Sequence, residues 1–359
     1  MTVPRLLFYV SGHGFGHATR AAAVIEALKE KTPRLEVFVR TSAHARHFPG
    51  AKTSRAELDG GMVQKNALDV DLNATFDAHA ALGERWDELV AAEARAIEKL
   101  APCVVVGDIP ALGFAAAARA GVPAAALGNF SWDWIFARYA KSDARFAPIA
   151  ERYARAYASA RLLLRLPMHC PMPAFGKIED LPLVARLSRV SRRAARARLG
   201  IDARKSVVLV SFGGFGAGAV DARAGDDLSR FLFIGFTAKP KGLRGDWLRL
   251  PRHLTTPHVD LVRACDVVLS KPGYGTISEA VAHGTRLLLA PRAGFPEIPA
   301  LERYVASLRA GTAISRAELF SGRWGKALER ALSLPPPEPP PSDGAARAAR
   351  RLTSFAQVC

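Results

Sequence analysis

The chain has 359 residues, of which 49% are hydrophobic and 23% are charged, and 50 Lys and Arg against 33 Asp and Glu give it a formal net charge of +17. This hydrophobic content excludes a wholly disordered chain, and the length suits two domains. The four cysteines form no C-x-x-C pair, which excludes a zinc ribbon and a thioredoxin-type redox motif.

The first half of the chain predicts a parallel α/β domain. An apolar strand at 6–11 leads through a Gly-rich turn at 12–17 into a helix at 18–31 and a second strand at 35–40. This strand–helix–strand order builds a parallel sheet. We expect further helices at 76–100 and 111–119, and further strands at 103–107, 123–128 and 161–166.

The second half of the chain repeats this architecture. A strand at 206–211 runs into a second Gly-rich turn at 212–218. A proline run at 335–341 suits an extended spacer, and a last helix is expected at 343–356. Between them we expect strands at 231–235, 267–270, 286–290 and 312–314, and helices at 258–264, 276–283 and 301–309.

The predicted organisation is therefore a first Rossmann-like domain at 1–185, a second at 186–334, and a spacer with a terminal helix at 335–359. Residues 1–10 lack the pattern of a signal peptide, and no apolar run of about 20 residues is uninterrupted, so we expect a cytoplasmic protein.

The basic excess has two interpretations. It attracts phosphates, either on nucleotides or on an anionic membrane face, where it would allow peripheral contact at the inner membrane. It also follows from composition, since Arg outnumbers Lys and Ala is abundant. The arginine cluster at 192–198 is interpreted as a solvated helix face. No nucleic-acid reader motif is present, so no nucleic-acid partner is expected.

The first Gly-rich turn carries Gly14 and Gly16 between a strand and a helix, where backbone N–H groups bind anions. Its spacing is not that of the G-x-G-x-x-G dinucleotide motif. Tight α/β turns also need glycine for conformational reasons alone. His13 and His17 are four residues apart but straddle this turn, so a metal site is not expected.

The segment 270–280 (SKPGYGTISEA) is the strongest site candidate, because it follows a predicted strand and opens a helix. Gly273 and Gly275 let the chain pass close to a ligand, and Thr276 is expected to cap the helix, whose N-terminus suits a diphosphate. Glu279 would repel phosphate, so it needs a hydroxyl partner, and a ribose diol fits. The alternative is that Glu279 only completes a capping box with Thr276.

Two further strand ends carry polar residues. Arg292 and Glu297 follow the strand at 286–290, where they suit a phosphate and sugar hydroxyls, or else form a surface salt pair. The segment 129–134 (NFSWDW) follows another strand. Asn129, Trp132 and Asp133 suit a sugar-binding platform for the acceptor, the alternative being a packing motif in which Asp133 caps a helix.

These motifs resemble known proteins along nearly the whole chain, from Val10 to Glu302. S-x-P-G-x-G-T-x-x-E followed by P-R-x-x-F-x-E resembles the donor site of GT-B glycosyltransferases, notably family 28, which includes the lipid-linked N-acetylglucosaminyltransferase of peptidoglycan synthesis. VSGHGFGHATR and NFSWDWIF resemble the glycosyltransferase-like N-terminal part of plant L-arabinokinases and its bacterial relatives. The galactokinase-type half of arabinokinases has no counterpart here.

The resemblance implies an α/β GT-B fold, in which two Rossmann-like parallel-sheet domains face a cleft and the terminal helix returns to the first domain. It implies transfer of a sugar from a nucleoside-diphosphate sugar, most simply a UDP-sugar, to an unidentified acceptor, with no cofactor and no metal. A UDP-sugar 2-epimerase and a silent UDP-sugar-binding protein are the alternatives. The implied donor contacts are Ser211, Gly213, Gly214, Lys271, Gly273, Gly275, Thr276, Glu279, Arg292 and Glu297, beside the loop glycines Gly14 and Gly16.

The resemblance also places a catalytic histidine, His17, at the end of the first Gly-rich loop. Histidine exchanges protons near neutral pH, so His17 suits the role of general base, with Asp108 and Asp133 as the other candidates. Asp108 follows the strand at 103–107 and should lie at the same sheet edge, where it would orient His17 or else cap the next helix. Glu297 is not followed by the Gln often found in the family, so the donor sugar is open.

Overall fold

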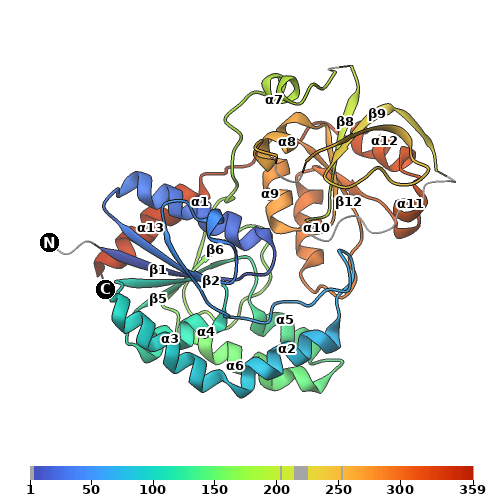
Figure 1. Ribbon diagram of the computed structural model, residues 1–359. Coiled ribbons are helices and arrows are strands. Elements are labelled where there is room, and N and C mark those ends of the chain that lie inside the picture. Colours follow the sequence, from blue (N-terminus) through green and yellow to red (C-terminus); the bar gives the residue numbers. More distant parts are fainter. Residues whose placement is uncertain (1–3, 203, 214–224, 252–253, 359) are drawn as a thin grey trace. The chain divides into compact units, whose positions relative to one another are not determined.

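In the computed structural model, residues 4–202, 204–213, 225–251 and 254–358 are described, and the chain divides into two compact units. The first comprises residues 1–63, 71–184 and 342–359, and the second comprises 64–70 and 185–341. Residues 64–70 and the stretch from Ser342 onward thus belong to a different unit from their chain neighbours. Figure 1 shows the elements of both.

Within the described ranges, the first unit is built on a seven-stranded sheet, ordered β3-β2-β1-β4-β5-β6-β7. Every pairing between neighbouring strands is parallel. The central strands are continuous apolar runs because helices cover both of their faces. The strands are β1 (Arg5–Val10), β2 (Glu36–Thr41), β3 (Lys52–Arg55), β4 (Val104–Asp108), β5 (Ala124–Gly128), β6 (Leu162–Arg165) and β7 (Ile178–Asp180).

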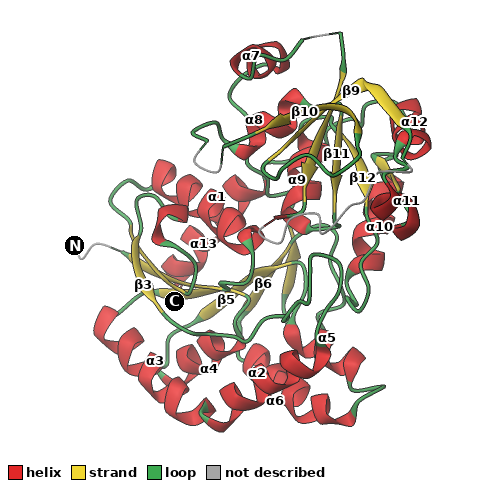
Figure 2. Ribbon diagram, turned by 45° about the vertical axis from the view of Figure 1, so that its right-hand side comes forward, coloured by secondary structure: helices red, strands yellow, loops and turns green. Residues whose placement is uncertain are grey.

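The helices of the first unit form a layer on each face of this sheet (Figure 2). One layer holds α1 and α13, and α3, α4 and α6 lie on the other side. The helices are α1 (Phe15–Lys31), α2 (Leu72–Glu84), α3 (Trp86–Leu100), α4 (Ala111–Arg119), α5 (Trp132–Tyr139), α6 (Ala147–Ala158) and α13 (Gly344–Val358), with short 3₁₀ turns at Ala45–His47 and Ala144–Phe146.

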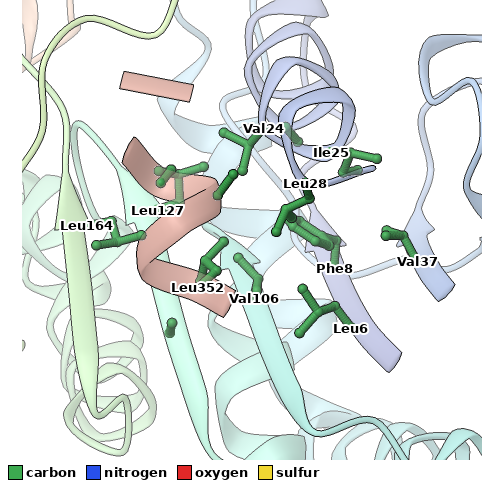
Figure 3. Close-up of a cluster of buried hydrophobic side chains, with 14 of the residues drawn as sticks. Leu6, Phe8, Val24, Ile25, Leu28, Val37, Val106, Leu127, Leu164 and Leu352 are labelled. Carbon is green, nitrogen blue, oxygen red and sulfur yellow. The ribbon is translucent and has the colours of Figure 1, made fainter. Parts of the chain in front are cut away.

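The terminal helix α13 is part of the first unit's core. Its residues Ala348, Ala349, Leu352 and Phe355 are buried with side chains of α1 and of the central strands. Figure 3 shows Leu352 beside Val106 of the sheet, with α1 next to α13. The apolar face expected of this helix therefore packs on the first sheet.

In the part of the chain that is described, the second unit has a six-stranded parallel sheet ordered β10-β9-β8-β11-β12-β13. Its strands are β8 (Ser206–Ser211), β9 (Asp227–Gly235), β10 (Arg244–Arg249), β11 (Val267–Ser270), β12 (Arg286–Leu289) and β13 (Gly311–Ala313). Its helices are α7 (Arg192–Arg198), α8 (His258–Ala264), α9 (Tyr274–Ala282), α10 (Ile298–Ser307), α11 (Arg316–Ser321) and α12 (Gly325–Ser333). Figure 2 shows α8 and α9 on one face of the sheet and α12 on the other.

Both sheets have the strand order of a doubly wound fold, counted within each unit as 3-2-1-4-5-6, and the first sheet adds a seventh strand after the sixth. In such sheets ligands bind at the carboxyl ends of the strands, where the order reverses. This point lies between β1 and β4 in the first unit and between β8 and β11 in the second.

Two expectations about elements were wrong, and one strand of the second sheet was not predicted. The helix expected at 76–100 is two helices, α2 and α3, because Arg85 between them leaves the helical conformation. The strand expected to close the first domain, at 161–166, is followed by the edge strand β7. The strand β10 was not predicted, since RGDWLR is polar and half-exposed at a sheet edge.

Candidate functional site

The two predicted catalytic residues meet at the reversal point of the first sheet. Val10, the last residue of β1, pairs with Asp108, the last residue of β4, and the Ser11 amide donates to the Asp108 carbonyl at 2.9 Å. The Gly-rich loop that follows leads directly into α1, which carries His17 in its first turn. The distance from His17 Nδ1 to Asp108 Oδ1 is 2.8 Å.

Asp108 is fully buried and also faces Arg20, one turn further along α1. Arg20 donates from Nε to Asp108 Oδ2 at 2.8 Å and from Nη2 to Oδ1. Burial by itself would raise the pKa of Asp108, but the charge and hydrogen bonds of Arg20, with those of His17, outweigh it and lower that pKa. Asp108 is therefore an ionised carboxylate, and both of its oxygens can only accept hydrogen bonds.

This charge decides the tautomer of His17. A carboxylate oxygen at 2.8 Å needs a donor, so Nδ1 of His17 carries the proton. Arg20 Nη2 lies 3.2 Å from the same nitrogen, but it is itself a donor and is satisfied by Asp108. In neutral His17 the other ring nitrogen, Nε2, therefore has the free lone pair that a general base needs.

Asn129 takes a different place from the acceptor contact predicted for it. It is buried, its Oδ1 accepts from Arg20 Nη1, and its Nδ2 donates to the Pro167 carbonyl. Asn129 therefore holds Arg20, which in turn holds Asp108. The sequence signal for Arg20 was a charged residue on the buried face of α1, three residues after His17.

Trp132, expected in an aromatic platform for the acceptor, is packed inside the first unit. Trp132 is 3% exposed, Phe136 stacks on it at 5.8 Å, and Phe130 lies at its edge. Asp133 is buried in the first turn of α5, and this burial raises the pKa of its carboxyl group. The aromatic residues of this segment therefore take part in packing, whereas Asp133 is not the cap of α5, and its Oδ1 is buried without a hydrogen-bond partner among the described residues.

A second histidine–aspartate pair lies in the first unit, and the sequence reasoning missed it. His13 Nε2 is 3.2 Å from the Asp59 carbonyl oxygen and 3.4 Å from Asp59 Oδ1. Asp59 Oδ1 also accepts from Ser11 at 3.3 Å, and Oδ2 accepts from Trp132 Nε1 at 3.3 Å. A Cβ at Gly61, whose φ is +54°, would stand 2.0 Å from His13 Cγ. The signal was the D-G-G sequence at 59–61.

Gly14 and Gly16 of the first loop differ in backbone conformation. Gly14 has a φ of +79° as the N-cap of α1, which is a conformation that favours glycine. Gly16 lies inside the first turn of α1, and a Cβ there would meet no described atom within 4 Å. Neither backbone strain nor crowding by the described residues requires glycine at position 16.

In the second unit, the reversal point carries the predicted donor residues. Ser211 ends β8 beside Ser270, which ends β11, and Ser270 pairs in turn with Leu289 at the end of β12. The residues that follow these strands therefore share one edge. Gly213 has a φ of +70° in the turn after β8, and Gly214 lies outside the described residues.

Glu279 lies on α9 at this edge and is almost completely buried. Its Oε1 accepts from Arg186 Nε at 3.0 Å and Nη2 at 2.8 Å, and its Oε2 faces His258 Nδ1 at 3.0 Å. Burial would raise the pKa of Glu279, but His258 and Arg186 lower it overall. His258 Nε2 also lies 3.4 Å from Ser211 Oγ. Sequence reasoning identified neither Arg186 nor His258.

The cap expected at Thr276 was wrong. The N-cap of α9 is Gly273, which has no side chain to cap the helix, and Thr276 lies within the first turn, as does Gly275. The capping-box interpretation of Glu279 therefore fails too. A Cβ at Gly273 would have 4.0 Å to its nearest described neighbour, the Lys271 carbonyl, so the backbone is open there.

Two cations converge at the same edge. Lys271 Nζ is 3.4 Å from Gln64 Oε1, and Arg292 Nη2 is 3.2 Å from the same oxygen. Burial, together with the charge of Arg292, lowers the pKa of Lys271 to about 8. A cation of this kind gains by meeting an anion.

Residues 64–70, which supply Gln64, form hydrogen bonds with the loop that carries Arg292 and with α11. Ala293 N donates to the Leu68 carbonyl at 2.9 Å, and Asp69 takes two hydrogen bonds from Arg316. Hydrogen bonds from Arg316 and Asn66 lower the pKa of Asp69 to about 2.

Glu297 precedes α10, and burial raises its pKa. Its Oε2 is buried and has no hydrogen-bond partner among the described residues. Arg292 stacks on Phe295, with its guanidinium carbon 3.3 Å from the ring centre. A buried oxygen without a donor is what a ligand hydroxyl would satisfy.

The arginine cluster at 192–198 is less solvated than expected. Arg192 and Arg196 each reach a carboxylate oxygen of Asp266 at 2.7 Å, and Arg196 also donates to the Ala264 carbonyl. Asp266 accepts from the Val207 amide as well, at 2.8 Å. Part of the basic excess therefore ties α7 to the second sheet.

Over the described ranges, no helix combines the length and the apolar character that crossing a membrane requires. In that same part of the chain, no three His, Cys, Asp or Glu side chains gather as metal ligands would.

Comparison with known proteins gives the fold and two relatives. No protein-family model matches the chain. It is 33% identical over 338 residues to L-arabinokinase of Arabidopsis thaliana, covering 92% of this chain and 32% of that protein. This chain thus spans about a third of that relative's length.

The second relative is the UDP-N-acetylglucosamine–N-acetylmuramyl-(pentapeptide) pyrophosphoryl-undecaprenol N-acetylglucosamine transferase of Thermus thermophilus. The two chains are 25% identical over 300 residues, and the alignment covers 80% of each. Among solved structures, the glycotransferase of kitacinnamycin aligns with a TM-score of 0.62 at 16% identity, over 99% of this chain and 98% of that one. The predicted resemblance and the GT-B fold are thereby confirmed.

Proposed function

We propose that this protein is a glycosyltransferase that moves a sugar from a UDP-sugar to a hydroxyl group of an acceptor. The observation that carries the proposal is the pair of His17 and Asp108, joined at 2.8 Å where the first sheet reverses its strand order. The similarity to a UDP-N-acetylglucosamine-dependent transferase over 80% of both chains supports the reaction class and the nucleotide.

In this mechanism His17 is the general base. Asp108 fixes the proton on Nδ1, so Nε2 accepts the proton of the acceptor hydroxyl as its oxygen attacks the anomeric carbon. The imidazolium that forms is stabilised by the Asp108 carboxylate, which stays ionised because Arg20 faces it. Arg20 and Asn129 act as positioning residues behind this pair.

The second unit binds the donor in this proposal. Glu279 accepts from the sugar of the nucleoside, and the diphosphate meets the N-terminus of α9 together with Lys271 and Arg292. These groups stabilise the negative charge of the departing diphosphate, so we expect transfer to need no added metal. Glu297 offers its unpaired oxygen to a hydroxyl of the transferred sugar.

The first experiment is a thermal-shift panel of UDP-, GDP-, ADP- and dTDP-sugars on the full chain. Binding stabilises a protein by about 2.7 kcal/mol at a hundredfold excess over Kd. The donor that stabilises it is then incubated with acceptor candidates, and release of the nucleoside diphosphate and the new glycoside are measured by mass spectrometry. Conversion of the UDP-sugar into an epimer of the same mass without any acceptor, separated by chromatography, would favour the epimerase alternative. Binding with neither epimer nor released diphosphate would favour the silent binder.

The base assignment is tested with His17→Ala. Turnover should fall by about 10²–10⁴-fold, the range for loss of a general base, while the affinity for UDP stays within about twofold. His13→Ala is the matched control, because it removes a second histidine of the same loop. If His17→Ala keeps full turnover, or loses UDP binding instead, His17 is not the base.

A further inference from the structure

The carboxylate of Glu279 has few open acceptor positions. An ionised carboxylate offers about four positions for hydrogen-bond donors. Oε1 already accepts two donors from Arg186, at 3.0 and 2.8 Å, and Oε2 accepts one from His258 Nδ1 at 3.0 Å. About one position, on Oε2, is left for a ligand.

The segment that carries Arg186 is anchored around Glu279. The Ser188 amide donates to His283 Nε2 at 2.8 Å, and the Ser188 hydroxyl donates to Asp260 Oδ1 at 2.6 Å. His283 in turn contacts the Glu279 carbonyl through Nδ1, at 2.6 Å. The backbone two residues after Arg186 is thus fixed beside α9, while the guanidinium itself is held by the Glu279 carboxylate.

We propose that the donor site reads only one sugar hydroxyl of the nucleoside, and therefore takes 2′-deoxyribonucleoside diphosphates as well as ribonucleoside diphosphates. This inference rests on the proposed function, in which Glu279 meets the nucleoside sugar. A ribose presents hydroxyls at C2′ and C3′, whereas the carboxylate has one position open. The second hydroxyl forms no hydrogen bond with Glu279, so its removal does not weaken binding at this residue. Arg186 is then a specificity-determining residue.

The test compares UDP with 2′-deoxy-UDP by isothermal titration calorimetry on the full chain. The two Kd values should agree within about twofold, because only one hydroxyl is bound. In Arg186→Gln the positions on Oε1 open to the second hydroxyl. UDP should then bind about tenfold tighter than 2′-deoxy-UDP, the effect of one hydrogen bond to a charged group.

Arg193→Gln is the matched control, since it removes the same charge from an exposed position on α7. Its ratio of the two Kd values should equal that of the parent chain. Arg186→Lys keeps the charge but donates from one nitrogen, so its ratio should fall between those of the parent and Arg186→Gln. It serves as the second variant where Arg186→Gln does not fold.

A parent chain that prefers UDP by tenfold or more would overturn the inference while leaving the proposed function intact. So would an Arg186→Gln protein, folded by circular dichroism, that still does not distinguish the two nucleotides. If neither nucleotide binds the folded parent chain, the assignment of the donor site fails, and the inference fails with it.

Discussion

Replacing Asp108 with Asn removes the negative charge that faces Arg20 and His17 inside the first unit. Asp108 has no exposed surface, and Arg20 is 8% exposed. Loss of one partner from a buried ion pair leaves the other charge uncompensated and costs about 3–5 kcal/mol. A loss of about 3 kcal/mol in a unit of this size lowers Tm by about 6–12 °C.

Thermal unfolding followed by circular dichroism at pH 7 measures this effect, and Asp143→Asn is the control. Asp143 pairs with Arg145 at 2.8 Å on the surface, so its loss should leave Tm nearly unchanged. The double variant Arg20→Met/Asp108→Asn should recover part of the loss, because no buried cation is then left unpaired. An Asp108→Asn protein that melts within about 2 °C of the parent would refute the reasoning.

The pH dependence gives an independent check of the same pair. The pKa of Asp108 is lowered in the folded protein, so the unfolded chain binds the proton more readily. The stabilisation is therefore complete above the ordinary aspartate pKa of about 4 and is lost as pH falls through the lower folded value. The difference in Tm between the parent and Asp108→Asn should be constant from pH 8 to about 5 and shrink in stronger acid.

Leu352→Ala should destabilise the first unit by about 2–5 kcal/mol in urea unfolding, because Leu352 is fully buried, whereas the exposed Ser354→Ala should have almost no effect. UDP binding should take up protons near pH 8–9, because an anion raises the Lys271 pKa from about 8, and Lys271→Met should abolish this uptake in calorimetry with buffers of different ionisation enthalpy. Burial lowers the pKa of His283, so the unfolded chain binds more protons below about pH 6.5 and stability falls with acid. His283→Gln should therefore show a shallower loss of Tm between pH 7 and 5, and an equal slope would contradict this origin.

What the sequence could predict was set by backbone geometry. Apolar runs followed by glycines located β1 and β8, and parallel strands bring their carboxyl ends to one edge, so His17 and Asp108 were correctly expected to meet. The same reasoning failed for Trp132, since a strand-end position does not say whether a side chain points toward solvent or into the core. Its burial depends on Phe130 and Phe136, which only the folded packing brings together.

The partners of the site residues could not be predicted, because they are distant in the chain. Glu279 is bonded to Arg186, which precedes it by 93 residues, and Lys271 meets Gln64 across 207 residues. No local spacing encodes such pairs. The role of Arg20 could have been suspected from the sequence, because a charged residue on the buried face of an amphipathic helix requires a buried partner.

The division of the first unit into separate stretches of chain has a consequence for its synthesis. Residues 1–184 emerge from the ribosome without α13, whose Ala348, Leu352 and Phe355 complete the core over α1. At about 5–20 residues per second, the ribosome takes roughly 8–30 s to add residues 185–342, which separate the two parts of the first unit. During that interval the apolar side of α1 and the central strands lacks its cover. The nascent first unit should therefore bind a chaperone that recognises apolar surface until α13 has been made.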